Sequence, residues 1–261
     1  MARRNNSLSG TVLFLALLWL APDARAAPQA AVPPGRIAAE QAYDAAKDRY
    51  QTNSADDEAA WQFARACFNR AEWAGKDSER AAVAKEGIAV CEKLLPRSPN
   101  LAAAYYYLGL NQAELARTKK LGGLSLVKEM EKAWKTARDL DAHFDFAGPD
   151  RSLGLLYRDA PHPPLSIGHR ASAEEHAQRA VELAPEYPDN HLDLIETHLK
   201  WDQLAAAARE DDALCQLLPA AQKQFSGPQW QIAWQEWDRR QEAIEKKLHH
   251  WRNTAARRRA P

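Results

Sequence analysis

Histidines and aspartates gather in one part of the chain and raise the question of a metal site. Helical zinc sites place two histidines one turn apart, whereas His169 and His176 are two turns apart and His162 lies between prolines. We therefore interpret these histidines as surface residues and predict no metal ion. The group comprises His143, Asp145, Asp150, His162, His169 and His176.

The sequence lacks the motifs of common catalytic sites. It contains no glycine-rich phosphate loop, no His-Glu-x-x-His, no Gly-x-Ser-x-Gly and no Cys-x-x-Cys. Ser125 and Ser152 have no histidine or aspartate at a spacing typical of a catalytic triad. We predict a protein that is not an enzyme and that holds no cofactor.

Two arginines are better placed to bind a ligand than the histidines and serines discussed above. Arg151 and Arg158 are seven residues apart, so on a helix they project from one face and can hold a carboxylate by paired, charge-assisted hydrogen bonds. In the alternative interpretation Arg151 pairs with an internal carboxylate such as Asp145 or Glu182. The sequence leaves both interpretations open.

The chain has three cysteines, Cys67, Cys91 and Cys215. Cys67 and Cys91 are equally distant from Glu79, inside a predicted helical hairpin turn, so a disulfide between them is possible. Helix axes pack about 8–10 Å apart, however, and a disulfide needs Cα atoms within about 7 Å. We favour buried free thiols and leave the bridge as an alternative.

The first residues have the pattern of a cleaved secretory signal. Two arginines precede an apolar run from Thr11 to Ala21, and Ala24-Arg25-Ala26 has small residues where a signal peptidase cuts. This run is shorter than the roughly 20 residues that cross a bilayer. We expect residues 1–26 to be a signal peptide cut after Ala26, which makes the mature protein periplasmic or secreted, with no transmembrane span.

The mature chain has the pattern of an all-α protein. Residues 27–36, "APQAAVPPGR", predict a flexible linker, and from Ile37 onward apolar residues recur at helical spacing. Four segments end alike, at Pro96, Ala142, Pro185 and Pro219. The last interval, 34 residues, is the period of a tetratricopeptide repeat (TPR). We predict an α-solenoid of about four irregular TPR-like helix pairs over residues 37–222, with a proline ending the second helix of most pairs.

Small and large residues alternate as such a stack requires. Gly154, in a Leu-Gly-x-x-Tyr element, is expected to lie where its partner helix, carrying Ala173 and Ala177, crosses closest. Longer intervals earlier in the chain arise from two enlarged turns within pairs, "ARTKKLGGLSLV" and "APHPPLSIG". No helix pair can bury its apolar surface alone, so the pairs must stack.

Tryptophans mark the final helix. Trp230, Trp234, Trp237 and Trp251 share one helical stripe within residues 223–251. We predict a helix that caps the last pair, and a docking surface for a membrane or protein is the alternative. A basic tail, residues 252–261, follows.

Part of this pattern resembles a known family. The segments "YYYLGLNQAELAR" and "FDFAGPDRSLGLLYRDAP…SIGHRASAEEHAQRAVELAPEYPDNHLDLIE" are similar to the T-component (TatT) proteins of TRAP transporters. The similarity covers roughly Trp61 to Pro219, and its most specific element is Ala-Gly-Pro-x-Arg-x-Leu-Gly, beginning at Ala147. This resemblance implies a periplasmic, all-helical protein that associates with itself and with a substrate-binding protein, and that holds a small, partly apolar ligand. The chain departs from the family in lacking a lipoprotein cysteine.

The predicted function is therefore protein binding on the concave face of the repeats. First helices line that face. After signal cleavage, 32 basic and 34 acidic residues remain of 35 each, a near-neutral balance that argues against nucleic acid as a partner. The alternative function is that of a TRAP transporter accessory that binds a small organic acid or apolar ligand. The candidate binding residues are Asn69, Arg70, Tyr106, Glu114, Arg151, Arg158, Leu192, Glu196 and Lys200.

Overall fold

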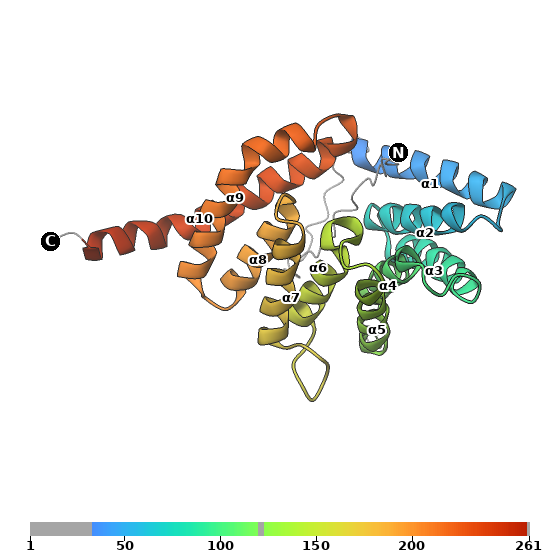
Figure 1. Cartoon of the computed structure of the whole chain (residues 1–261), viewed down its shortest axis with the longest axis horizontal. Helices are drawn as coiled ribbons and strands as arrows, with labels where there is room; N and C mark the ends of the chain where they lie inside the picture. The colour runs from blue at the N-terminus through green and yellow to red at the C-terminus, as the bar shows by residue number, and fades with distance from the viewer. Residues whose placement is uncertain (1–32, 120–122, 260–261) are drawn as a thin grey trace, which may run out of the picture. The chain divides into compact units, whose positions relative to one another are not determined.

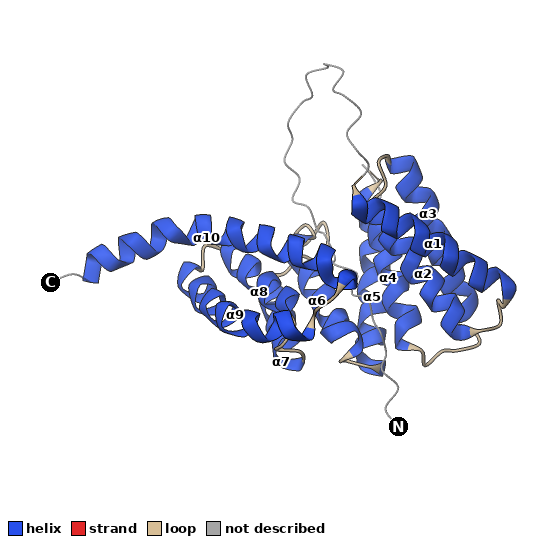
Figure 2. Ribbon diagram, turned by 90° about the horizontal axis from the view of Figure 1, so that it is seen from above, coloured by secondary structure: helices blue, strands red, loops and turns tan. Residues whose placement is uncertain are grey.

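A computed structural model describes residues 33–119 and 123–259, with side chains through Asn253. All regular secondary structure in these ranges is helical (Figures 1 and 2). The chain divides into two compact units, one reaching Met130 and the other starting at Glu131. The predicted signal peptide, residues 1–26, and residues 27–32 of the predicted linker lie outside the described residues.

The first unit is a stack of antiparallel helices. Contacts join α1 to α2, α2 to α3, α3 to α4 and α2 to α4 (Figure 1). Asp56 begins α2 by accepting a hydrogen bond from the backbone N–H of Glu58, which satisfies one of the open donors of the first turn. The helices are α1 (Pro34–Thr52), α2 (Asp57–Glu72), α3 (Asp77–Leu94), α4 (Ala102–Arg117) and the first part of α5 (Leu124–Leu140).

The second unit continues the helical pairs and ends in a long helix. Contacts join α6 to α7, α7 to α8 and α8 to α9, and α10 packs on α8 and α9. The helices after α5 are α6 (Phe144–Asp159), α7 (Arg170–Leu183), α8 (Pro188–Lys200), α9 (Leu204–Gln224), the 3-10 turn η1 (Pro228–Trp230) and α10 (Gln231–Arg259).

The predicted all-α, TPR-like solenoid is confirmed, and α2–α3, α6–α7 and α8–α9 pack as helix pairs. The close crossing at Gly154 is also confirmed. A Cβ atom there would lie 3.1 Å from the backbone nitrogen of Ala177 and 3.4 Å from the carbonyl oxygen of Ala173. Helix α1 is an additional helix that precedes the first pair.

The enlarged turn between α6 and α7 closes on itself. The N–H of Gly168 donates to the carbonyl of Pro161 at 2.9 Å, and the N–H of His169 donates to that of Tyr157 at 3.0 Å. A Cβ on Gly168 would lie 1.9 Å from the carbonyl oxygen of Ala160, so only glycine fits.

Three predicted boundaries are wrong. Residues 34–36 of the predicted linker already belong to α1, because Pro34 occupies the first turn, where a missing N–H costs nothing. Pro219 does not end α9, which continues to Gln224, so that Ala221 within the helix and Phe225 directly after it are buried in the core. The predicted basic tail is not separate, because α10 continues to Arg259.

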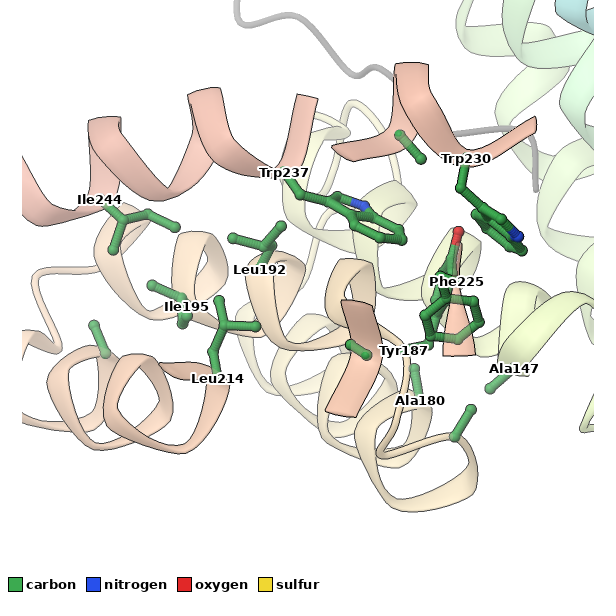
Figure 3. Close-up of a cluster of buried hydrophobic side chains, with 14 of the residues drawn as sticks. Ala147, Ala180, Tyr187, Leu192, Ile195, Leu214, Phe225, Trp230, Trp237 and Ile244 are labelled. Atoms are coloured by element: carbon green, nitrogen blue, oxygen red, sulfur yellow. The ribbon is translucent and has the colours of Figure 1, made fainter. Parts of the chain in front are cut away.

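The tryptophan stripe of α10 packs inward, as the capping interpretation predicts. Trp230, Trp237, Ile244 and Leu248 are buried in one cluster with residues of α8 and α9, and Trp234 and Trp251 pack against it (Figure 3). No helix in the described part of the chain is long and apolar enough to cross a membrane.

Candidate functional site

Arg151 lies in the interior of the second unit, with 2% of its surface exposed. Its Nη1 donates to the carbonyl of Phe146 at 3.0 Å and to Oδ1 of Asn190 at 3.1 Å. Its Nη2 donates to the carbonyl of Asp145 at 3.2 Å and to the carboxylate of Asp145 at 3.3 Å. The guanidinium also lies over the ring of Tyr187, 5.1 Å from its centroid.

These bonds hold an unusual stretch of backbone at the start of α6. Asp145, Phe146 and Ala147 have φ angles of 51°, 55° and 60°, in the left-handed region that favours glycine. Each such residue costs about 1–2 kcal/mol. Asn190 supports the turn from α8, because its Nδ2 donates to the carbonyls of Phe146, Ala180 and Ala184 at 3.0–3.1 Å.

The left-handed turn sets Phe146 into an aromatic cluster. Its ring stacks on Tyr187 at 4.6 Å and meets Phe225 edge-on at 5.4 Å and Trp230 at 6.2 Å. Tyr187, Phe225 and Trp230 lie together in Figure 3, beside Trp237. The turn therefore joins the start of α6 to the core made by α8, α9 and α10.

Arg151 therefore stabilises the left-handed turn from the protein interior and does not line a surface. The interpretation in which it pairs with Asp145 is confirmed, and the shared open face with Arg158 is wrong for Arg151. The reason is local: the left-handed turn brings two carbonyl groups and a carboxylate back over the side chain. Nothing in the residue types of this turn signals it, because none of the three residues is glycine.

Arg158, Glu196 and Lys200 do come together. Arg158 pairs with Asp159 at 2.9 Å and with Glu196 at 3.5 Å. Lys200 pairs with Asp159 at 2.9 Å and donates to the carbonyl of Arg158 at 2.6 Å. The side chains of Asp159, Glu196 and Lys200 are 31%, 33% and 42% exposed, respectively. Arg158 itself is buried beneath them, so the prediction that it lines the open surface is wrong. We call Arg158, Asp159, Glu196 and Lys200 the charged face.

Arg240, from α10, supports this face from the buried side. Its guanidinium pairs with Asp189 at 2.9 Å, with Asp193 at 2.5 Å and with Glu196 at 2.8 Å. These three carboxylates follow one side of α8, at intervals of four and three residues. Sequence reasoning missed Arg240, because it lies 44 residues from Glu196 and was assigned to the capping helix.

In this cluster, burial raises the pKa values of the carboxyl groups, whereas the nearby cations lower them. Burial raises the pKa of Asp193 to about 6, although Arg240 opposes the shift. Burial also disfavours ionised Glu196 and Asp159, but the nearby cations outweigh it and lower the pKa of both carboxyls. The carboxylates hold the pKa of Arg240 well above its ordinary value, against its burial.

The other predicted binding residues are divided between core and surface. Leu192 and Tyr106 are fully buried, so the prediction that they line a surface is wrong, because neighbouring helices cover them. Glu114 is buried and pairs with Arg80 at 3.1 Å and Arg117 at 2.8 Å, and burial raises its pKa.

Asn69 and Arg70 are half-buried neighbours on α2 that point in different directions. Arg70 pairs with Glu79 at 3.2 Å and lies over the ring of Tyr43, which belongs to α1. The Oδ1 atom of Asn69 is buried and has no hydrogen-bond partner among the described residues. Arg70 is therefore engaged in packing, while Asn69 keeps unused hydrogen-bonding capacity.

The cysteines and histidines have separate environments. Cys67 and Cys91 are free and buried, so they form no disulfide, and burial raises the pKa of both thiols. His176 bonds to Asp150 at 2.7 Å and His162 to the carbonyl of Gly168 at 2.9 Å. Within the described ranges, no group of three or more His, Cys, Asp or Glu residues could hold a metal ion.

Comparison with known proteins supports the fold. No protein-family model matches the chain, and no curated protein matches it. The crystal structure of a thermophilic TPR protein of Thermus thermophilus is similar, with a TM-score of 0.55 and 19% sequence identity. The match covers 70% of this chain and 87% of the other. At this identity the likeness shows a TPR-like helical fold and nothing about partners.

Proposed function

We propose that the protein is an exported scaffold that binds protein partners through the charged face. The observation that supports this is that partly exposed Asp159, Glu196 and Lys200, from α6 and α8, gather around the buried guanidinium of Arg158. TPR-like folds bind proteins through the inner surfaces of their helix pairs. The pairing of both cations and both carboxylates within the face also fixes the positions of their charges.

The charged face has the physical properties of a recognition surface. Arg240 holds Glu196 in place, so a partner meets a side chain whose position is already set. Charges at the rim of an interface act mainly on association rate and on the choice of partner. We therefore expect binding that weakens at high salt.

The test is quantitative capture of partners from the periplasmic or secreted fraction. Lys200→Glu reverses the most exposed charge of the face, and Lys246→Glu makes the same change at an exposed position of α10. Wild type and Lys246→Glu should enrich the same proteins, and Lys200→Glu should lose them. Equal enrichment by all three proteins would exclude the charged face as the docking surface.

A second candidate function is that of a T-component-like accessory to a TRAP-type transporter. The observation that favours it is that the most specific element of the resemblance begins at Ala147, the last residue of the left-handed turn, and contains Arg151, which holds that turn by hydrogen bonds. This proposal requires genes for a TRAP permease and a substrate-binding protein beside the gene for this chain. It also requires that the purified substrate-binding protein bind the chain, and absence of binding would reject it.

A further inference from the structure

The first unit contains a buried arginine without a counter-charge. Arg65, on α2, has 9% of its surface exposed, and its Nη2 is buried without a hydrogen-bond acceptor. It forms no ion pair among the described residues, where the other three buried arginines, Arg151, Arg158 and Arg240, each contact a carboxylate. A buried guanidinium without an anion is costly, so its position is explained best if an anion arrives from outside.

A second group with unused hydrogen-bonding capacity lies one helical turn away. Asn69 is four residues after Arg65, so both side chains lie on the same side of α2. Its Oδ1 atom is buried and has no partner within the described part of the unit. A side-chain amide offers two N–H donors when turned the other way, so Asn69 can add a donor beside the guanidinium.

An aromatic surface flanks the pair on the other side. Trp61 is four residues before Arg65, and its ring stacks on Tyr107 of α4 at 5.8 Å with an interplanar angle of 6°. Trp61 is only half-buried. A ligand held by Arg65 therefore has an apolar, flat neighbour one turn along the helix.

We propose that Arg65 and Asn69 form a binding site for a monocarboxylate whose apolar body packs on Trp61. One guanidinium matches one carboxylate in charge, and its fork of N–H groups matches the two oxygens. Arg70, the other cation on this part of α2, is already paired with Glu79. A dianion at this site would therefore have only the charge of Arg65 to neutralise it, and its second negative charge would remain unpaired. The site lies in the first unit and does not depend on the charged face.

Benzoate is the probe, and benzamide is its neutral counterpart of the same shape. Isothermal titration should show saturable binding of benzoate to wild type at millimolar concentration, with benzamide giving none. Arg65→Gln should weaken benzoate binding at least about tenfold. Lys93→Gln removes one positive charge from an exposed position of α3 and should bind as wild type.

Thermal unfolding of Arg65→Leu separates binding from a purely structural role. Because the substitution removes a buried charge without a partner, the unliganded variant should unfold at or above the wild-type temperature. Benzoate should raise the unfolding temperature of wild type and leave that of the variant unchanged. The proposal fails if Arg65→Gln keeps the wild-type affinity, if benzamide binds as tightly as benzoate, or if both Arg65 variants lose cooperative unfolding.

Discussion

Replacing Arg151 by methionine should destabilise the second unit strongly. Methionine keeps the length of the aliphatic stem and removes the guanidinium, which leaves the carboxylate and carbonyl of Asp145 and the carbonyl of Phe146 without this donor. Breaking a buried ion pair by removing one partner costs about 3–5 kcal/mol. The left-handed turn stores a similar amount, roughly 3–6 kcal/mol over three residues. We therefore expect Arg151→Met to lower the free energy of unfolding by about 3–5 kcal/mol.

Urea unfolding followed by tryptophan fluorescence measures this loss. Six of the nine tryptophans lie after Glu131, so the signal reports mainly the second unit. Arg170→Met is the matched control, because Arg170 forms an exposed pair with Glu174 at 2.8 Å. Such pairs contribute about 1 kcal/mol at most.

A loss below about 1 kcal/mol for Arg151→Met, comparable to that of Arg170→Met, would mean that the guanidinium does not stabilise the turn. It would also reopen the interpretation in which Arg151 serves a ligand.

Three further predictions concern the loop, the charged cluster and the core. Gly168→Ala should open the turn between α6 and α7, because its Cβ would collide with the carbonyl of Ala160, and limited proteolysis should cut there sooner. Between about pH 4 and pH 7, wild type should lose roughly 1–3 kcal/mol of stability relative to Asp193→Asn. The pKa of Asp193 is about 6 in the folded protein, above the value in the unfolded chain, so the folded protein binds more protons in this pH window and rising pH destabilises it. Asp238→Asn, at an exposed site, is the control. Trp237→Ala should lower the free energy of unfolding by about 3–5 kcal/mol in urea titrations, because the side chain is 1% exposed.

Much of the fold could be predicted because its signals are local. The helical spacing of apolar residues and the small residue at Gly154 act over one or two turns, and both features describe the structure correctly. Pro185 lies beyond the end of α7, as a helix-ending proline should. Pro219 does not end its helix, because the burial of Phe225 beyond it stabilises continued helix more than the proline destabilises it.

The charged face could be predicted only in part, because side-chain burial depends on distant segments. Spacing placed Glu196 and Lys200 on one side of a helix correctly. It could not show that three non-glycine residues adopt left-handed backbone before Arg151, or that Arg240 of α10 reaches Asp189 of α8. Both effects arise from tertiary contacts that periodicity does not contain.

The decisive difference between a structural and a ligand-binding arginine is the set of acceptors around it. Arg151 and Arg65 are both buried residues on the first helix of a pair, and helical spacing made only Arg151 a candidate for ligand binding, with an internal ion pair as the open alternative. Arg151 already contacts a carboxylate, carbonyl groups and an amide oxygen, so a ligand would have to displace satisfied bonds. Arg65 forms no ion pair within the described residues and keeps a buried N–H group without an acceptor, so an arriving carboxylate would not have to break an ion pair. Mutagenesis aimed at binding should therefore begin with Arg65, and mutagenesis aimed at stability with Arg151.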